Sequence, residues 1–465
     1  MRWRVVIELT SGDGAVHAHE VATCSDDSAG SAVKPLGLTL ADAKALLAAI
    51  QRHLVQAEVA DYCRERRCCP RCQKQRPMKD VRARRLNSLF GTVEVRAPRF
   101  KPCRCSIASR RTLTPVAEIM ADRCTAEYER IVAKLGAWMP YRRARDLLAE
   151  FFPLGDDVPE VETIRQRTLR VGARLEREAL SPANCSVPPA EAMTVSIDGG
   201  HVRSARGYQG RTFEVFVAHV GNDNGQQIVF SSVPAEADKQ RHQLSGVLQS
   251  LGMTPQTPVT VLSDGAVGPR ALGEAASTGP VRHILDWFHL AMRLRHLTQI
   301  AGSLPSDGPE RAAAKAVTVE EVERLRWRLW NGKATDARIS LDRIRAVTHH
   351  FRGEPDGRRS VAPSRKLWTA LRSLNDYLAG QSDRLVNYAE RHRAGQRVGT
   401  ALTEGTANFL VNRRMAKAQQ MRWTRRGADR LLQVRCAVYN GTLGTGFGQR
   451  FHAANDQHAP MALAA

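Results

Sequence analysis

Two aspartates near the middle of the chain have the surroundings that a metal-dependent site requires. Asp198 follows a run in which polar and apolar residues alternate, and Asp264 follows an apolar run, so each is expected to end a strand. Glycine comes directly after each aspartate, which strengthens this interpretation. Two carboxylates that lie close together repel each other unless a cation separates them, and Mg²⁺ or Mn²⁺ prefers such oxygen ligands. Taken singly, each Asp–Gly pair could also merely start a turn.

The segments around these aspartates predict one α/β region over residues 193–290. Strand-like runs and helical spacing follow each other in the order strand, strand, strand, helix, strand, helix, strand. The expected strands are residues 194–198, 213–220, 228–233, 259–262 and 281–285, and the first helix is expected over 236–251. This is the order of a ribonuclease-H-like core, in which the first and fourth strands are neighbours. Because neighbouring strands lie about 4.8 Å apart, Asp198 and Asp264 are expected to converge on one site.

A third carboxylate is expected from Glu404. Thr403 stands where it can cap a helix, and a carboxylate in the first turn is favoured by the helix dipole. On a helical wheel, Glu404 falls at the margin of the packed side of this helix. A Glu that only starts a helix is the alternative. Glu390 is a second candidate for the third acid, but its neighbours in the sequence look exposed.

The long segment before Glu404 is expected to be an all-α insertion over residues 291–398. Helical spacing and many basic residues fill residues 309–393. A gap of this length can hold a complete helical insertion between two parts of one core. The predicted core residues of this segment are Trp327, Trp330, Trp368 and Leu371.

Six of the ten cysteines lie between Cys63 and Cys105, a spacing that indicates metal ligation rather than disulfides. A Cys-Pro-Arg-Cys knuckle, a β-hairpin and a second cysteine pair together predict a zinc ribbon. The expected ligands of a structural Zn²⁺ are Cys69, Cys72, Cys103 and Cys105. Cys63 or Cys68 could substitute, because the Cys-x-Cys spacing of the second pair is short. Buried free thiols are the alternative to a metal site.

Residues 111–180 are expected to form a helical, helix-turn-helix-like DNA-binding domain. A first helix over 141–152 and a Pro-Leu-Gly turn precede a second helix with several arginines. The first residues of a recognition helix reach base edges, and Arg suits guanine while Gln suits adenine. The predicted DNA contacts of this helix are Arg165, Gln166 and Arg170. Any basic helical hairpin is the alternative reading of the same pattern.

Composition points to a polyanionic partner. The 465 residues carry 69 Lys and Arg against 47 Asp and Glu, a formal net charge of +22, which is typical of nucleic-acid-binding proteins. The first residues lack the apolar run of a signal peptide, and no run is apolar enough to span a membrane, so a cytoplasmic location is expected. The remaining predicted boundaries are an N-terminal region at 1–62, a zinc ribbon at 63–110, a linker at 181–192, a last part of the core at 399–445 and a tail at 446–465.

These residues together resemble a DDE transposase of a bacterial insertion sequence. The chain is most similar to the Kra-type group, whose catalytic domain is related to the Mutator and hAT transposases. The matching motifs are SIDGGHVR around Asp198, LSDGA around Asp264, DWFH ending at His289, and TEGTANFLVNRRMAKAQQMRWTRRGADRLLQVR from Thr403 onward. The resemblance covers residues 190–440, and the cysteine-rich segment matches more loosely.

The resemblance implies a two-metal mechanism on double-stranded DNA. Asp198, Asp264 and Glu404 would hold two Mg²⁺ or Mn²⁺ ions for cleavage and strand transfer at transposon ends and target DNA. His289 would position the phosphate or the DNA end, with a purely structural histidine as the equal alternative. A homodimer or larger assembly on DNA in a bacterial nucleoid is expected. Further DNA contacts are expected from Arg413, Arg414, Lys417 and Trp423. Trp423 could stack on a displaced base near the transposon end, although core packing is the favoured interpretation of this residue.

Two other functions fit parts of this pattern. A domesticated, catalytically silent transposase could act as a DNA-binding regulator. A nuclease with a ribonuclease-H-like fold could cut without strand transfer, although such an enzyme needs neither a zinc ribbon nor a helical insertion.

Overall fold

A computed structural model describes most of the chain. The described residues are 3–24, 37–103, 105, 112–120, 122–180, 187–234, 237–351, 356, 361–417 and 421–444. The chain divides into two compact units, Met1–Val171 with Gly441–Ala465, and Gly172–Asn440. The predicted tail and the first half of the predicted linker lie outside the described residues. No helix in the described part of the chain has the length and apolar character needed to cross a membrane.

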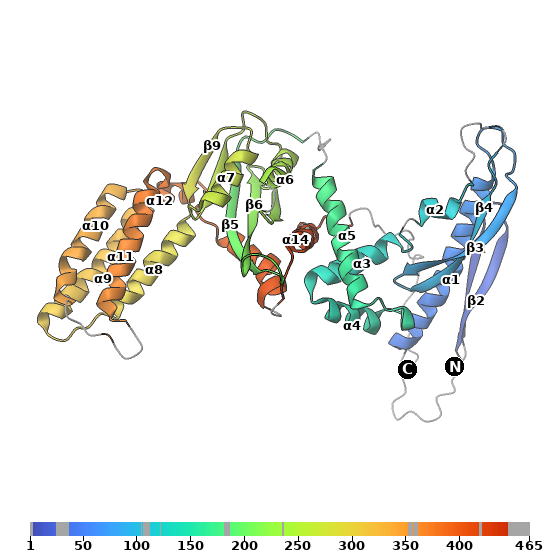
Figure 1. The fold of residues 1–465 in the computed structure, drawn as a ribbon, viewed down its shortest axis with the longest axis horizontal. Coiled ribbons are helices and arrows are strands. Elements are labelled where there is room, and N and C mark those ends of the chain that lie inside the picture. Colours follow the sequence, from blue (N-terminus) through green and yellow to red (C-terminus); the bar gives the residue numbers. More distant parts are fainter. Residues whose placement is uncertain are drawn as a thin grey trace, which may run out of the picture. The chain divides into compact units, whose positions relative to one another are not determined.

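The first unit begins with a β-hairpin, a long helix and a second β-hairpin (Figure 1). The first two strands pair antiparallel. The long helix is capped at Thr39 and runs four residues beyond Cys63. The elements are β1 (Trp3–Thr10), β2 (Val16–Cys24), α1 (Leu40–Arg67), β3 (Met78–Ser88) and β4 (Gly91–Phe100).

A helical segment follows, and it contains the predicted pair of helices. Its buried cluster joins Tyr128, Leu148 and Ile164 from three different helices. The elements are α2 (Pro115–Ile119), α3 (Ala126–Trp138), α4 (Tyr141–Phe151), a 3₁₀ turn η1 (Gly155–Asp157) and α5 (Val161–Ala179).

A five-stranded mixed sheet forms the centre of the second unit (Figure 1). Its strands are β5 (Met193–Arg203), β6 (Thr212–Asn222), β7 (Gln227–Ser232), β8 (Val259–Ser263) and β9 (Val281–Leu285). The order across the sheet is β7-β6-β5-β8-β9. β5, β8 and β9 are parallel, and β6 is antiparallel to both of its neighbours. The prediction that the first and fourth strands are neighbours is confirmed.

Helices cover both faces of this sheet. On one face, α6 (Ala237–Ser250) and α7 (Val267–Ala276) bury Leu244 and Leu272 against Val195 and Val261 of the strands. On the other face lie α13 (Ala401–Ala407) and α14 (Arg425–Tyr439). Contacts on that face include a 2.6 Å hydrogen bond between His219 of β6 and Thr406 of α13.

The first strand of the sheet is longer than predicted. β5 does not end at Asp198 but continues through Gly199 and Gly200 to Arg203, paired with β6 in an unbroken register. Glycine weakens a strand but does not prevent pairing when the partner strand supplies a continuous ladder. Asp198 therefore lies in the middle of a strand, and the prediction that the strand ends there was wrong.

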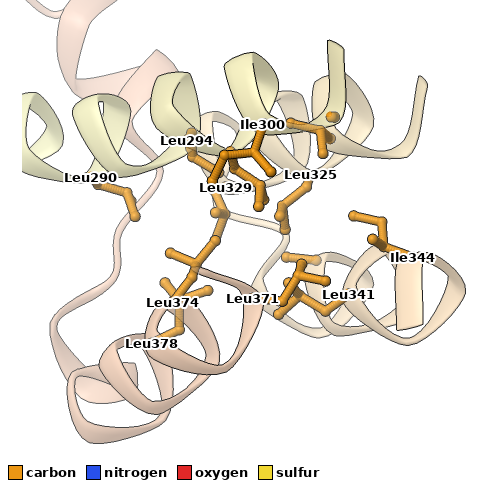
Figure 2. Close-up of a cluster of buried hydrophobic side chains, with 14 of the residues drawn as sticks. Leu290, Leu294, Ile300, Leu325, Leu329, Leu341, Ile344, Leu371, Leu374 and Leu378 are labelled. Carbon is orange, nitrogen blue, oxygen red and sulfur yellow. The ribbon is translucent and has the colours of Figure 1, made fainter. Parts of the chain in front are cut away.

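The predicted helical insertion packs around a core of its own (Figure 2). The helices are α8 (Trp287–Gly302), α9 (Pro309–Trp330), α10 (Ala334–Val347), η2 (Thr348–Phe351), α11 (Pro363–Gly380), η3 (Ser382–Arg384) and α12 (Tyr388–Arg393). The same cluster includes Leu262 and Ile284 of β8 and β9, so the helices are anchored to one edge of the sheet.

Of the four predicted core residues of this insertion, two were wrong. Leu371 is fully buried, and Trp330 packs against the cluster. Trp327 and Trp368 are 56% and 53% exposed. Their large aromatic side chains favour a core position by residue type, but both lie on outward-facing positions of their helices.

The segment that carries Glu404 also differs from the prediction. α13 begins at Ala401, so Thr403 is inside the helix and does not cap it; its hydroxyl instead donates to the Ser196 carbonyl at 3.3 Å. From Asn408 to Lys417 the chain continues as a π-helix, η4. A wheel drawn with ordinary α-helical spacing therefore fails beyond Ala407.

Candidate functional site

The alternation of side chains along β5 places Asp198 on the face of the sheet that α13 covers. Val195 and Ile197 of β5 point toward α6 and α7, and successive side chains of a strand point to opposite faces, so Asp198 points the other way. Asp264 directly follows the last residue of β8.

The register of the sheet places the two aspartates level with each other. β5 pairs with β8 in parallel, from Met193 opposite Val259 to Ser196 opposite Leu262. Asp198 and Asp264 follow this pairing by two residues on each strand. Beyond Asp264 the chain turns at Gly265, whose φ of +89° and close approach to the Gln381 amide leave no room for a larger side chain.

Glu404 and His289 complete a compact group with Asp198. Ligand atoms of these three residues all lie within 4.8 Å of one another, the spacing that a shared metal ion requires. His289 Nε2 lies 3.5 Å from Glu404 Oε1. Asp264 is outside this group of three. Glu390 is exposed on α12 and is also outside the group.

A fully buried carboxylate, Asp286, supports this group from behind His289. It caps α8 by accepting hydrogen bonds from the backbone N–H groups of Phe288 and His289. Its Oδ2 lies 2.5 Å from His289 Nδ1. This contact fixes the orientation of the imidazole and directs Nε2 toward Glu404.

The sequence did not predict a role for Thr400, yet Thr400 donates two hydrogen bonds to the Asp286 carboxylate. Its backbone N–H donates to Asp286 Oδ1 at 2.8 Å, and its hydroxyl donates to Oδ2 at 2.5 Å. One turn later on the same segment comes Glu404, whose N–H donates to the Thr400 carbonyl at 2.9 Å. No local sequence signal identifies a threonine that contacts a residue more than a hundred positions away.

Two residues of α11 also contact the loop that carries Asp264. The hydroxyl of Tyr377 donates to the Asp264 carbonyl at 2.9 Å, and Gln381 Nε2 donates to the Gly265 carbonyl at 3.3 Å. The helical insertion therefore supports the position of the second aspartate directly.

The electrostatics of the group favour a bound cation. Burial, with smaller contributions from the carboxylates of Glu404 and Asp264, raises the pKa of Asp198 to about 6 against the opposing effect of His289. The hydrogen bond to Asp286 raises the pKa of His289. Burial alone would raise the pKa of Asp286, but hydrogen bonds from His289 and Thr400 hold it below its usual value. The site thus concentrates negative charge that a hard cation would neutralise.

The four predicted zinc ligands come together in the first unit. Ligand atoms of Cys69, Cys72, Cys103 and Cys105 lie within 4.8 Å of one another. Sγ–Sγ distances are 3.5 Å for Cys69–Cys105 and 3.3 Å for Cys72–Cys103. The two alternative ligands lie elsewhere, because Cys63 is buried in an apolar cluster and Cys68 is exposed.

The chemistry of this cysteine group fits a metal. Backbone N–H groups of Cys72 and Arg71 lower the pKa of Cys69 to about 6. The neighbouring sulfurs of Cys103, Cys69 and Cys72 raise the pKa of Cys105 to about 12. All four sulfurs could be ionised at this spacing only around a cation, and four sulfur ligands would leave no open position for catalysis.

The residues of α5 that were predicted to contact DNA instead bind neighbouring acidic side chains in this structure. Arg165 and Gln166 both donate to Glu162, at 2.6 Å and 3.0 Å, and their hydrogen bonds lower the pKa of Glu162 to about 2. Arg170 lies 3.6 Å from Asp122. All four ionic side chains remain accessible, so phosphate or base contacts would have to compete with these pairs.

Two of the four predicted DNA contacts after Glu404 do not fit the structure. Trp423 is buried and donates from Nε1 to the Met415 carbonyl at 3.2 Å. Arg414 is also buried, with its guanidinium 5.3 Å from the Trp423 ring. Both side chains pack within the unit instead of facing DNA. Arg413 is exposed, and the side chain of Lys417 lies outside the described residues.

Comparison with known proteins gives little further information. No protein-family model matches the chain, and no curated protein is similar to it in sequence. Among solved structures it is similar to a Drosophila P element transposase in a strand transfer complex, with 13% identity and a TM-score of 0.34, covering 69% of this chain and 93% of that chain. A score this low carries no weight for the function of this chain.

Proposed function

We propose that this chain is a DDE-type DNA transposase with a ribonuclease-H-like catalytic core. The observation that carries the proposal is the arrangement of Asp198, Asp264 and Glu404. Asp198 lies on β5 with a ligand atom within 4.8 Å of one on Glu404 of α13, and Asp264 directly follows the neighbouring strand β8, close enough for its charge to raise the pKa of Asp198. The helical insertion separates Glu404 from both aspartates in the sequence. Carboxylates collected in this way are suited to metal-dependent phosphoryl transfer.

The donor set fits two hard cations. Three carboxylates supply only oxygen ligands, which Mg²⁺ and Mn²⁺ prefer. Burial is the main cause of the raised pKa of Asp198, and the carboxylates of Glu404 and Asp264 add to it. When bound, the ions would activate the attacking oxygen and stabilise the leaving oxygen of a DNA phosphodiester.

The chain's own residues would orient the phosphate. Asp286 holds His289 by Nδ1, so Nε2 is presented to the site beside Glu404. A protonated imidazole in this position can donate to a phosphate oxygen, and the raised pKa of His289 favours that form. Asp286 and Thr400 act through these two residues and do not reach the substrate themselves.

The rest of the chain offers the means to bind DNA. The formal net charge of +22 favours a polyanion, and the helical pair α4 and α5 together with the cysteine knuckle would contribute contacts to transposon ends. Because strand transfer joins two DNA ends to a target, an assembly of at least two chains on DNA is part of the proposal.

The direct test is cleavage and joining of a labelled duplex that carries the sequences flanking the gene. The wild-type chain should give nicked and joined products only with Mg²⁺ or Mn²⁺. Asp264→Asn and Glu404→Gln should lower the product yield by about 10³-fold or more while leaving DNA binding intact.

Glu390→Gln is the matched control, because Glu390 is an exposed acid outside the group. It should leave the yield unchanged. Cleavage without joining would indicate a nuclease instead, and end binding without any product would indicate a regulator. Loss of activity in Glu390→Gln with retention in Glu404→Gln would show that the third carboxylate was wrongly chosen.

A further inference from the structure

A second cavity in the same unit has no role in the proposed chemistry. Its volume is about 690 Å³, and it is enclosed by α5, the turn between β5 and β6, α6 and the first turns of α14. All of its lining residues belong to the unit Gly172–Asn440. A space of this size is within the range that holds a small organic ligand.

The acids of this cavity are already neutralised. Lys239 forms ion pairs with both Glu176 and Asp429, the latter at 3.0 Å. Arg430 lies 3.6 Å from Glu176. These four side chains form a closed network of two acids and two bases.

Three further arginines, Arg177, Arg425 and Arg426, give the cavity its net positive charge. Arg425 and Arg426 line it, are exposed, and form no ion pair with any described residue. They are the first two residues of α14, where the backbone also carries partial positive charge. Guanidinium groups at the N-terminus of a 15-residue helix are well suited to a phosphate.

The cavity also has features that a phosphate alone would not need. Gln243 is only 2% exposed, it lines the cavity, and neither polar atom of its amide has a hydrogen-bond partner among the described residues. A buried amide without partners costs free energy unless a ligand or water satisfies it. Tyr208 adds a half-exposed aromatic ring at the turn between β5 and β6.

From this combination we propose that the cavity binds a nucleotide. The base would pair its polar edge with the Gln243 amide, which can donate and accept at once, and would stack on Tyr208. The phosphate would lie against Arg425 and Arg426. The nucleotide comes either from a DNA strand or from the free pool, and both share this chemistry. The proposal does not depend on the carboxylate site.

Binding of a fluorescent 12-nucleotide deoxyadenosine strand to the full-length chain, without added divalent ions, tests the proposal. Tyr208→Ala should weaken binding about tenfold, and Tyr208→Phe should bind like the wild type, because stacking requires the ring and not the hydroxyl. Gln243→Met, which keeps the side-chain volume, should also weaken binding. An abasic strand of equal length should bind the wild type more weakly and be insensitive to both substitutions.

The phosphate contact is tested with a matched pair of double variants. Arg425→Ala with Arg426→Ala should weaken binding about tenfold or more. Arg295→Ala with Arg372→Ala removes the same charge from exposed helix positions elsewhere in the unit and should have little effect. Equal losses in both pairs, or equal binding of the abasic and normal strands, would overturn the proposal. Thermal unfolding of each variant separates loss of binding from loss of folding.

Competition with free deoxyadenosine monophosphate distinguishes the two sources. Displacement at millimolar concentration with the same dependence on Tyr208 and Gln243 would assign the cavity to free nucleotides. Strand binding that the free nucleotide does not displace would assign it to DNA. Because metal-dependent cleavage plays no part in these measurements, their outcome is independent of that of the catalytic proposal.

Discussion

Thr400 and the buried carboxylate of Asp286 are joined by two hydrogen bonds across 114 positions of the sequence. Thr400 stands just before α13, the helix that carries Glu404. Asp286 caps α8, the helix that carries His289. This single contact therefore fixes the relative positions of two functional side chains after the chain has passed through the whole helical insertion.

Thr400→Val should lower strand cleavage about 10- to 100-fold, as is usual when a support of metal ligands is lost. Valine keeps the shape of the threonine side chain but lacks the hydroxyl that donates a hydrogen bond to Asp286. Because the effect acts through Glu404, the Mn²⁺ concentration needed for half-maximal activity should rise as well. A duplex cleavage assay over a range of Mn²⁺ concentrations measures both quantities.

Thr400→Ser provides the rescue, since it restores the hydroxyl and should retain most of the activity. Thr369→Val is the matched control, because the Thr369 hydroxyl bonds only to its own helix, at the Arg365 carbonyl. If Thr400→Ser were as impaired as Thr400→Val, packing of the methyl group would be responsible and the hydrogen bond would not.

Removal of a zinc ligand should affect the first unit alone. Cys72→Ser should lose the bound zinc, about one ion per chain, and expose residues 63–105 to proteolysis, because the metal replaces a core in this segment. Cys68→Ser should keep both the zinc and the protection, since Cys68 is exposed and outside the group of four. Elemental analysis and limited proteolysis measure these outcomes. Equal zinc content in both variants would contradict the assignment of ligands.

The stability of the second unit should fall in mild acid because of His219. Burial lowers the pKa of this histidine from 6.5 to about 4. In the unfolded chain His219 becomes protonated below pH 6.5, whereas in the folded chain it becomes protonated only below about pH 4. The unfolding free energy therefore decreases as the pH falls from 6.5 to 4. The contribution amounts to about 2 kcal/mol between pH 7 and pH 4.5.

His219→Gln should remove this part of the pH dependence, because Gln can still bond to Thr406 but does not titrate. Denaturant unfolding at pH 7 and pH 4.5 gives the comparison. His242→Gln, at an exposed position of α6, should leave the pH dependence as it is in the wild type. A His219→Gln variant with the full wild-type loss in acid would show that other groups are responsible.

The helical insertion should be far more sensitive at Leu371 than at Trp368. Leu371→Ala leaves a cavity in the fully buried cluster and should cost about 2–5 kcal/mol of unfolding free energy. Trp368→Ala removes a larger side chain, but more than half of that side chain is exposed, and the cost should be about 1 kcal/mol or less. Thermal unfolding of both variants checks the order, and a reversed order would contradict the packing shown in Figure 2.

The strand order and the four clustered cysteines could be predicted because their signals are local. Apolar runs ended by Asp–Gly mark β8, and the spacing of the knuckle marks Cys69 and Cys72. The end of β5 could not be predicted, because its glycines stay paired through β6 and not through any preference of their own.

Tertiary contacts explain the other differences. Thr400 is recognisable only from its contact with Asp286, which the sequence separates from it by the whole insertion. Trp423 stands in a basic segment, but its backbone N–H donates to the Arg203 carbonyl and its ring is buried, in agreement with the core packing that the sequence favoured over base stacking. Residue type alone does not distinguish a tryptophan that stacks on DNA from one that packs.

The most direct test of the central claim is metal rescue at Asp264. Thiolate is a poor ligand for Mg²⁺ and a better one for Mn²⁺, so Asp264→Cys should cleave DNA with Mn²⁺ but not with Mg²⁺, whereas the wild type should use both. That result would show that residue 264 binds the catalytic ion. Equal activity of Asp264→Cys with both ions would contradict the account, because the Asp264 carboxylate would then have no part in binding the metal.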